Sequence, residues 1–261
     1  MDGSLFPRTR WQALGWALKE HFPRFVLLSL LSFLFAFPLW VYFLFFSFYF
    51  SAPEPFSLPS LLSYLALIPL NAIAFLGQGG LFWCARKTAF LEGSSPKEDF
   101  FFGVRRTFRE SLLSGLLFSS LYVLLKFALS LLFSLSLPSF AYPCLSGFLY
   151  CLAFLLGLSF SFLLPQGALY SSSVSQSFLN SWRFFLGGFL GNVPLYLAFC
   201  LPWIVFEIFP YFWVYLGLSL FYFLFYAFFS ALLWTYRSHA LFDEGINKAS
   251  YPEIYRKGLR K

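Results

Sequence analysis

The chain has 261 residues, of which 59% are hydrophobic and only 11% are charged, and its formal net charge is +7. This composition excludes a soluble globular protein and a disordered chain, and the basic residues lie in short connections rather than in a nucleic-acid-binding domain. Four long runs contain no charged residue, at 25–53, 55–85, 127–182 and 208–236. A helix needs about 20 apolar residues to cross a hydrocarbon core of about 30 Å, so these runs predict a polytopic membrane protein.

The apolar runs predict an all-α transmembrane bundle, because backbone polar groups in lipid must be satisfied within a helix. Turn-forming residues divide the runs, including Pro53 and Pro55, Pro138, and Pro210. The six expected spans are 25–50, 58–85, 111–137, 140–164, 184–206 and 208–236. We expect a single integral membrane domain, with 1–24 as a cytoplasmic interfacial helix, 25–236 as the bundle and 237–261 as a basic cytoplasmic tail.

The orientation follows from the distribution of Lys and Arg. Four basic residues precede the first span, six lie between 86 and 110, six follow from Arg237, and Arg183 lies in the fourth connection. The first, third and fifth connections contain no Lys or Arg. With six spans, all of these basic sites fall on one side, so the positive-inside rule predicts that both termini are cytoplasmic.

Short amphipathic helices are expected on the cytoplasmic surface before each pair of spans, at 11–22, 95–109 and 172–183. The second has a capping-box pattern, with Ser95 as the N-cap, Pro96 at the first helical position and Glu98 three residues after the cap. An interfacial helix followed by two spans is therefore a candidate internal repeat. The similarity of 77–82 (GQGGLF) to 165–170 (PQGALY) favours the repeat, whereas the dominance of Phe, Leu and Ser allows the same similarity by chance.

The stretch from Gly77 to Leu125 carries a family resemblance. The motifs that carry it are the glycine-rich span end, Ala85-Arg86-Lys87, Glu92-Gly93, Asp99-Phe100-Phe101, Gly103-Val104-Arg105 and Glu110-Ser111. This pattern resembles the YesL-like family of uncharacterised bacterial membrane proteins. The resemblance implies a bacterial inner-membrane location and a link to transport, since members are often associated with carbohydrate uptake systems. It implies no catalytic residues.

Lys126 is the one basic residue inside a predicted span. It shares a helical face with Ser119 and Tyr122, and a lysine in hydrocarbon costs about 2.5–3.5 kcal/mol, which makes it a functional candidate. The alternative is a structural role, in which Lys126 extends toward the headgroups or pairs with Glu207.

Three amides are the other candidates for a polar path: Gln78, Gln166 and Asn192. They can line a substrate path, or they can make interhelical hydrogen bonds worth about 0.6 kcal/mol each.

Three arginines, Arg105, Arg106 and Arg109, lie beside a run of phenylalanines and are expected to contact anionic lipid headgroups. The expected partners are therefore the lipid bilayer and, for an assembly role, other membrane protein subunits, but not nucleic acid. The four cysteines form no CxxC pair and neither histidine has a second ligand at metal spacing, so we expect no metal and no cofactor.

No span contains a nucleophile with a base, or paired carboxylates, so the sequence does not indicate an enzyme. The candidate repeat, the proline- and glycine-interrupted spans and Lys126 favour a transporter or transport-accessory protein. The alternative is a structural or assembly subunit of a larger membrane complex.

Overall fold

The computed structural model describes residues 7–48, 58–93, 95–135, 138–170, 172–209 and 211–259. Across these ranges the regular structure is helical, without a strand. Six segments are long and apolar enough to cross a membrane: Phe22–Phe45, Leu62–Ala89, Phe108–Ser134, Ala141–Leu169, Phe189–Phe206 and Phe212–Ser250. The predicted all-α bundle with six spans is confirmed, and the chain is a multi-pass membrane protein.

The helices follow one another with short connections. In chain order they are α1 (Arg10–Phe48), α2 (Leu58–Ala89), α3 (Pro96–Arg106), α4 (Phe108–Ser134), α5 (Ala141–Phe160), α6 (Leu163–Leu169), α7 (Val174–Gly187), α8 (Phe189–Ile208), α9 (Phe212–Phe221), the π-helical turn η2 (Tyr222–Tyr226), α10 (Ala227–Phe242), the π-helical turn η3 (Asp243–Asn247) and α11 (Lys248–Ser250).

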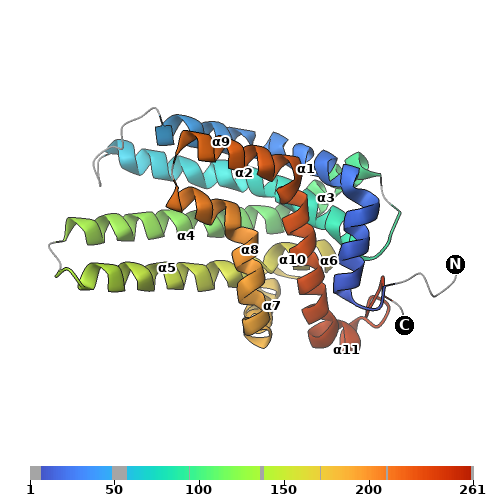
Figure 1. Ribbon diagram of the computed structural model, residues 1–261. Helices are drawn as coiled ribbons and strands as arrows, with labels where there is room; N and C mark the ends of the chain where they lie inside the picture. The colour runs from blue at the N-terminus through green and yellow to red at the C-terminus, as the bar shows by residue number, and fades with distance from the viewer. Residues whose placement is uncertain are drawn as a thin grey trace.

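Helix α2 is the centre of the arrangement. It packs against α1, α3, α4, α6 and α10, while α5 lies on the far side of α4 (Figure 1). Most of α1, together with α2, α4 and α5, runs lengthwise through the molecule. At one end the first part of α1, α7 and α10 run across that direction (Figure 1). Helix α1 contains Pro23 and Pro38, and an internal proline is a usual cause of such a bend.

The packed core lies mainly at the end where these helices cross. Its largest fully buried side chains include Trp234, Tyr236, Phe82 and Phe100. In contrast, α4, α5 and α9 expose large apolar side chains near the opposite end, such as Phe133 at 76% and Trp213 at 77%. Exposure of this kind is unfavourable in water but favourable in hydrocarbon, as expected for lipid-facing helices.

The interfacial helix predicted at 95–109 forms as α3, but it ends at Arg106, and Arg109 belongs to α4. Asp99, Phe100 and Gly103 are buried, which gives α3 a packed face and an exposed face. Ser95 is the N-cap as predicted, but its side chain makes no capping hydrogen bond. The predicted N-cap position is therefore confirmed, but the predicted capping hydrogen bond of Ser95 is wrong.

Two other predicted helix ends differ from the structure. The segment 11–22 is not a separate surface helix, because α1 is continuous from Arg10. The last helix does not end at Tyr236, because Tyr236, His239 and Phe242 are all buried and the helical path extends to Ser250. Burial against α1 and α2 thus keeps helical a segment whose charges suggested a tail.

Helices α2 and α4 approach closely at Gly115. A Cβ atom on Gly115 would lie 2.7 Å from the Ala72 Cα, a backbone atom that cannot move without displacing α2. Small residues permit this kind of close helix packing in membranes.

We predict that Gly115→Ala destabilises the protein by about 1–3 kcal/mol, as overpacking of a close contact does. The matched control is Gly147→Ala in α5, where a Cβ would meet nothing within 4 Å. The control should be neutral or slightly stabilising, since alanine is favoured over glycine in helices by about 1 kcal/mol. Thermal unfolding in detergent measures both, and equal midpoints would contradict the packing assignment.

Candidate functional site

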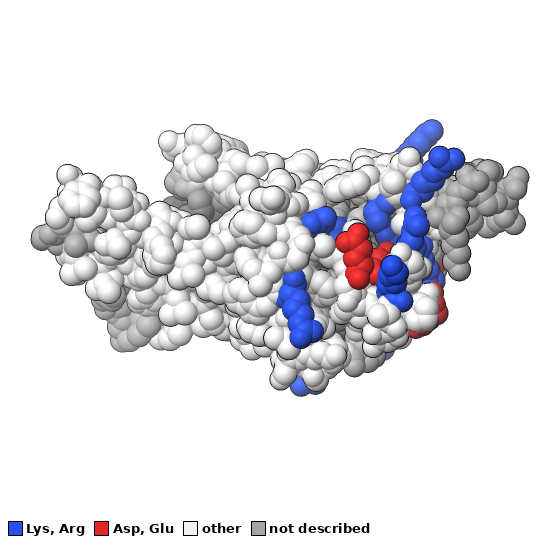
Figure 2. Space-filling model, turned by 90° about the horizontal axis from the view of Figure 1, so that it is seen from below, with Lys and Arg blue, Asp and Glu red and all other residues white. Residues whose placement is uncertain are grey.

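The charged side chains gather at one end of the molecule. On the face seen in Figure 2, the Lys, Arg, Asp and Glu side chains lie over one half, and the described residues of the other half of this face show none. The charged half is the end where α1 begins and where α3 and α11 lie (Figure 1). The sequence predicted this one-sided arrangement from the Lys and Arg residues in the tails and connections.

Ser119, a predicted path residue, is buried in α4 and serves helix packing. Its Oγ accepts a hydrogen bond of 3.0 Å from the Asn71 Nδ2 of α2 and donates to the Gly115 carbonyl. The predicted polar face of this helix is therefore divided, since Ser119 is buried whereas Tyr122 and Lys126 are only half-buried.

Gln166 is also buried, in the short helix α6. Its Nε2 donates to the Ser181 Oγ at 2.8 Å and to the Ser177 carbonyl at 3.1 Å, so it joins α6 to α7. Asn192 in α8 accepts a hydrogen bond of 2.8 Å from the Arg237 Nε, and its Nδ2 donates to the Phe184 carbonyl. Both amides are used within the protein for interhelical contacts.

Gln78 lies opposite an irregular turn of the last helix. Its Nε2 donates to the Tyr222 hydroxyl at 3.0 Å, and Tyr222 is the first residue of η2. The Gln78 Oε1 is buried and has no hydrogen-bond partner among the described residues. Next to Tyr222, Tyr226 donates to the Ala198 carbonyl and connects η2 to α8. The structure thus distributes the predicted path residues over separate interhelical pairs.

Lys126 is half-buried on α4, and its Nζ lies 5.3 Å from the centroid of the Tyr122 ring, one turn earlier. This geometry fits a cation–π interaction between two of the predicted residues. The backbone of Glu207 is in α8, but its side chain lies outside the described residues. The pairing of Lys126 with Glu207 therefore stays a prediction.

A double-mutant cycle separates the two roles of Lys126. If it pairs with Glu207, then Lys126→Leu and Glu207→Gln should each lower stability by about 3–5 kcal/mol, as breaking a buried pair does, with strong non-additivity in the double variant. If Lys126 faces a functional cavity, Lys126→Leu should leave the thermal midpoint unchanged or slightly raised and abolish activity. Additive stability changes would contradict the pairing.

A buried ion pair holds the start of the chain to its end. The Arg10 guanidinium lies 2.8 Å from the Asp243 carboxylate, and each side chain is 8% exposed. Asp243 also accepts hydrogen bonds from the Asn247 Nδ2 and the Arg256 amide, while Arg10 donates to the Lys257 carbonyl. A buried pair is stable only with such additional hydrogen bonds, because the desolvation of both charges costs several kcal/mol.

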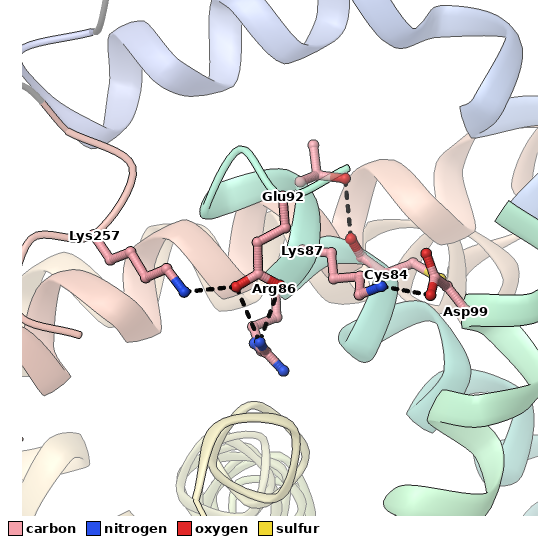
Figure 3. Close-up of polar contacts among 7 residues, drawn as sticks. Cys84, Arg86, Lys87, Glu92, Asp99 and Lys257 are labelled. Carbon is pink, nitrogen blue, oxygen red and sulfur yellow. Dashed lines mark hydrogen bonds and ion pairs between the residues drawn. The ribbon is translucent and has the colours of Figure 1, made fainter. Parts of the chain in front are cut away.

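A second group of charges lies around the connection between α2 and α3. Figure 3 shows the Glu92 carboxylate between the Lys257 Nζ, at 2.7 Å, and the Arg86 guanidinium, at 3.1 Å. The Arg86 guanidinium also lies over the Trp83 ring, 4.4 Å from its centroid. Burial alone would raise the pKa of Glu92, but the hydrogen bonds and positive charges of Lys257 and Arg86 outweigh it and hold that pKa below its usual value.

Another ion pair joins α2 to α3, where the Lys87 Nζ lies 2.6 Å from the Asp99 Oδ1 (Figure 3). Asp99 is 9% exposed, and its other oxygen, Oδ2, has no hydrogen-bond partner among the described residues. At the charged end, these ion pairs join the start of α1 to η3, residues 251–259 to the α2–α3 connection, and α2 to α3.

The sequence patterns indicated neither Arg10 nor Asp243, which are 233 residues apart. One local signal existed, because Arg10 shares a helical face with Ala13, Leu14 and Ala17, all buried. A charge on a face of small residues indicates a buried partner. Nothing local indicated which acid that partner is.

Arg105, Arg106 and Arg109, predicted to contact lipid headgroups, are all exposed. Phe101, Phe102 and Phe108 beside them are 44%, 54% and 50% exposed. Arginines and exposed phenylalanines on one surface of a membrane protein suit the region between headgroups and acyl chains. Within the described ranges, no group of three or more His, Cys, Asp or Glu side chains lies close enough together to hold a metal ion.

No protein-family model matches the chain, and no curated protein or solved structure is significantly similar to it.

We predict that Glu92→Gln lowers the thermal midpoint at pH 7, because it removes the carboxylate that holds Lys257 and Arg86. The pKa of Glu92 is lower in the folded state, so its stabilisation is present above the unfolded pKa of about 4.3 and is lost as the pH falls through the folded value. The difference between wild type and variant should therefore shrink below about pH 4. The control is Glu253→Gln, which removes an exposed acid from residues 251–259, the segment that contains Lys257. Its thermal midpoint should not differ from that of wild type at pH 7 or below pH 4. A difference that persists in acid would contradict the assignment.

Proposed function

We propose that the protein is a non-enzymatic transport or transport-accessory protein of the bacterial inner membrane. The observation that supports this most directly is the bend in the sixth candidate span at the π-helical turn η2. The helical path follows α1 and α2 as α9 and then turns across the bundle as α10 (Figure 1). π-Helical turns inside a helix are frequent at functional sites.

The side chains around η2 fit a neutral, hydroxyl-bearing solute. Gln78 presents a carbonyl oxygen without a partner among the described residues, and Tyr222 and Tyr226 supply hydroxyls and ring faces. Among the described residues, no charged side chain makes a hydrogen bond or ion pair with this group, which suits an uncharged ligand. The resemblance to the YesL-like family, with its link to carbohydrate uptake, supports the same class of solute.

A second candidate is a structural or assembly subunit. It is supported by the use of Ser119, Gln166 and Asn192 in interhelical hydrogen bonds, since these residues contribute to packing rather than to a common path. On this alternative the extensive apolar faces of α4, α5 and α9 contact other membrane proteins as well as lipid.

Flux of radiolabelled neutral sugars and polyols into proteoliposomes tests the first proposal. Wild-type vesicles should take up at least one solute faster than protein-free vesicles, and Gln78→Leu should abolish the difference while leaving the thermal midpoint within a few degrees. Asn71→Leu is the matched control, since it also removes one amide hydrogen bond from α2 but lies outside the η2 group, and it should retain flux.

Purification from native membranes separates the alternatives. The transport proposal expects flux from the isolated monomer or homo-oligomer. Absence of flux for every solute, together with partner proteins that co-purify at a fixed stoichiometry, would overturn it in favour of the assembly subunit. Equal flux in wild type and Gln78→Leu would reject the η2 group as the site.

A further inference from the structure

The charged end contains a groove beside α3 that the intramembrane polar residues do not use. Its volume is about 720 Å³, within the range of ligand sites in proteins. Side chains from the end of α2 and from α3 line it: Trp83, Lys87, Lys97, Glu98, Asp99, Phe101, Phe102 and Arg105. Basic, acidic and aromatic side chains therefore meet in one groove at the predicted membrane surface.

Two buried polar atoms of the lining have no partner among the described residues. One is the Asp99 Oδ2, a carboxylate oxygen of a side chain whose Oδ1 already binds Lys87. The other is the Trp83 Nε1, an indole donor. Buried polar groups are nearly always hydrogen-bonded, so an acceptor and a donor left without partners at one groove indicate a ligand that offers both kinds of group.

The remaining charges of the groove are of both signs. Lys97 and Arg105 are exposed and make no hydrogen bond or ion pair within the described part of the chain, and Glu98 lies between them in sequence beside Asp99. Two cations suit a phosphodiester, and two carboxylates suit an ammonium group. A purely anionic headgroup would leave the Asp99 and Glu98 carboxylates opposite a like charge, which is unfavourable.

The aromatic side chains indicate where the ligand's apolar part lies. Phe101 and Phe102 are 44% and 54% exposed, and the Phe102 ring packs 5.1 Å from the Trp83 ring. An apolar rim next to a charged groove suits a molecule with a polar head and acyl chains.

We propose that this groove binds an aminophospholipid, a lipid with a phosphodiester and a primary ammonium group. Lys97, Arg105 and the Trp83 indole N–H bind the phosphodiester, and the Asp99 Oδ2 and Glu98 bind the ammonium. Phe101 and Phe102 contact the glycerol and the first part of the acyl chains. Lys87 holds the Asp99 carboxylate in place through their 2.6 Å ion pair.

Lipid titration followed by native mass spectrometry of the detergent-solubilised protein tests the proposal. The probes are dioleoyl phosphatidylethanolamine, phosphatidylcholine and phosphatidylglycerol. Phosphatidylethanolamine should bind at least about tenfold more tightly than phosphatidylcholine, whose quaternary ammonium donates no hydrogen bond to Asp99. Phosphatidylglycerol, which has no ammonium, should also bind more weakly.

Two variants of equal charge change locate the site. Arg105→Gln removes a groove residue and should weaken phosphatidylethanolamine binding about tenfold. Arg183→Gln removes an exposed arginine of α7 that neither lines the groove nor belongs to the predicted headgroup-contacting arginines, and it should leave binding unchanged. Circular dichroism and elution volume confirm that both variants are folded.

The choice of lipid can also reject the proposal. Equal binding of phosphatidylethanolamine and phosphatidylcholine would show that the ammonium donors are not recognised. Tighter binding of phosphatidylglycerol, with equal losses in Arg105→Gln and Arg183→Gln, would show a general cationic surface instead of this site. Either result would overturn the proposal.

Discussion

The cost of placing charge in hydrocarbon is the constraint on which the rest of this structure depends. A charged side chain at the centre of a bilayer is unfavourable by several kcal/mol, and each helix must satisfy its own backbone. The helices are therefore long, apolar and exposed at one end, and the described charges gather at the other (Figure 2), with Lys126 inside the α4 span as an exception. Once gathered there, basic and acidic side chains from distant parts of the chain lie close enough to pair.

Those pairs give the charged end a rigidity that apolar contacts between exposed helices do not supply. Arg10 with Asp243 and Glu92 with Lys257 join segments that are far apart in the sequence, and Lys87 with Asp99 joins α2 to α3. At Gly258, a backbone φ of +83° and a close approach to the Ala89 carbonyl bring residues 251–259 onto the end of α2. Glycine is suited to both requirements, since it has no Cβ. The α3 groove is thus built on a fixed platform.

Spans, and the surface helix α3, could be predicted from sequence because their signals are local. Charge-free runs give the spans, and Pro96 with the alternation of Phe and Arg gives α3. The ends of α1 and α10 could not be predicted, because burial against distant helices extends both past their charged residues. Likewise, Gln78 was a candidate on composition, but its partner Tyr222 is 144 residues away and depends on the turn at η2. Contacts between residues so far apart in the sequence produce no local pattern of spacing or periodicity.

The orientation predicted by the positive-inside rule, with the charged end in the cytoplasm and the uncharged end outside, is the prediction that a labelling experiment tests most directly. In a background without the four native cysteines, Lys97→Cys places a thiol in exposed α3 and Ser139→Cys places one in the exposed connection between α4 and α5. A membrane-impermeant maleimide applied to sealed right-side-out vesicles should label Ser139→Cys and leave Lys97→Cys unlabelled, and inside-out vesicles should give the reverse. Labelling of Lys97→Cys from outside, or of both thiols from one side, would contradict the account.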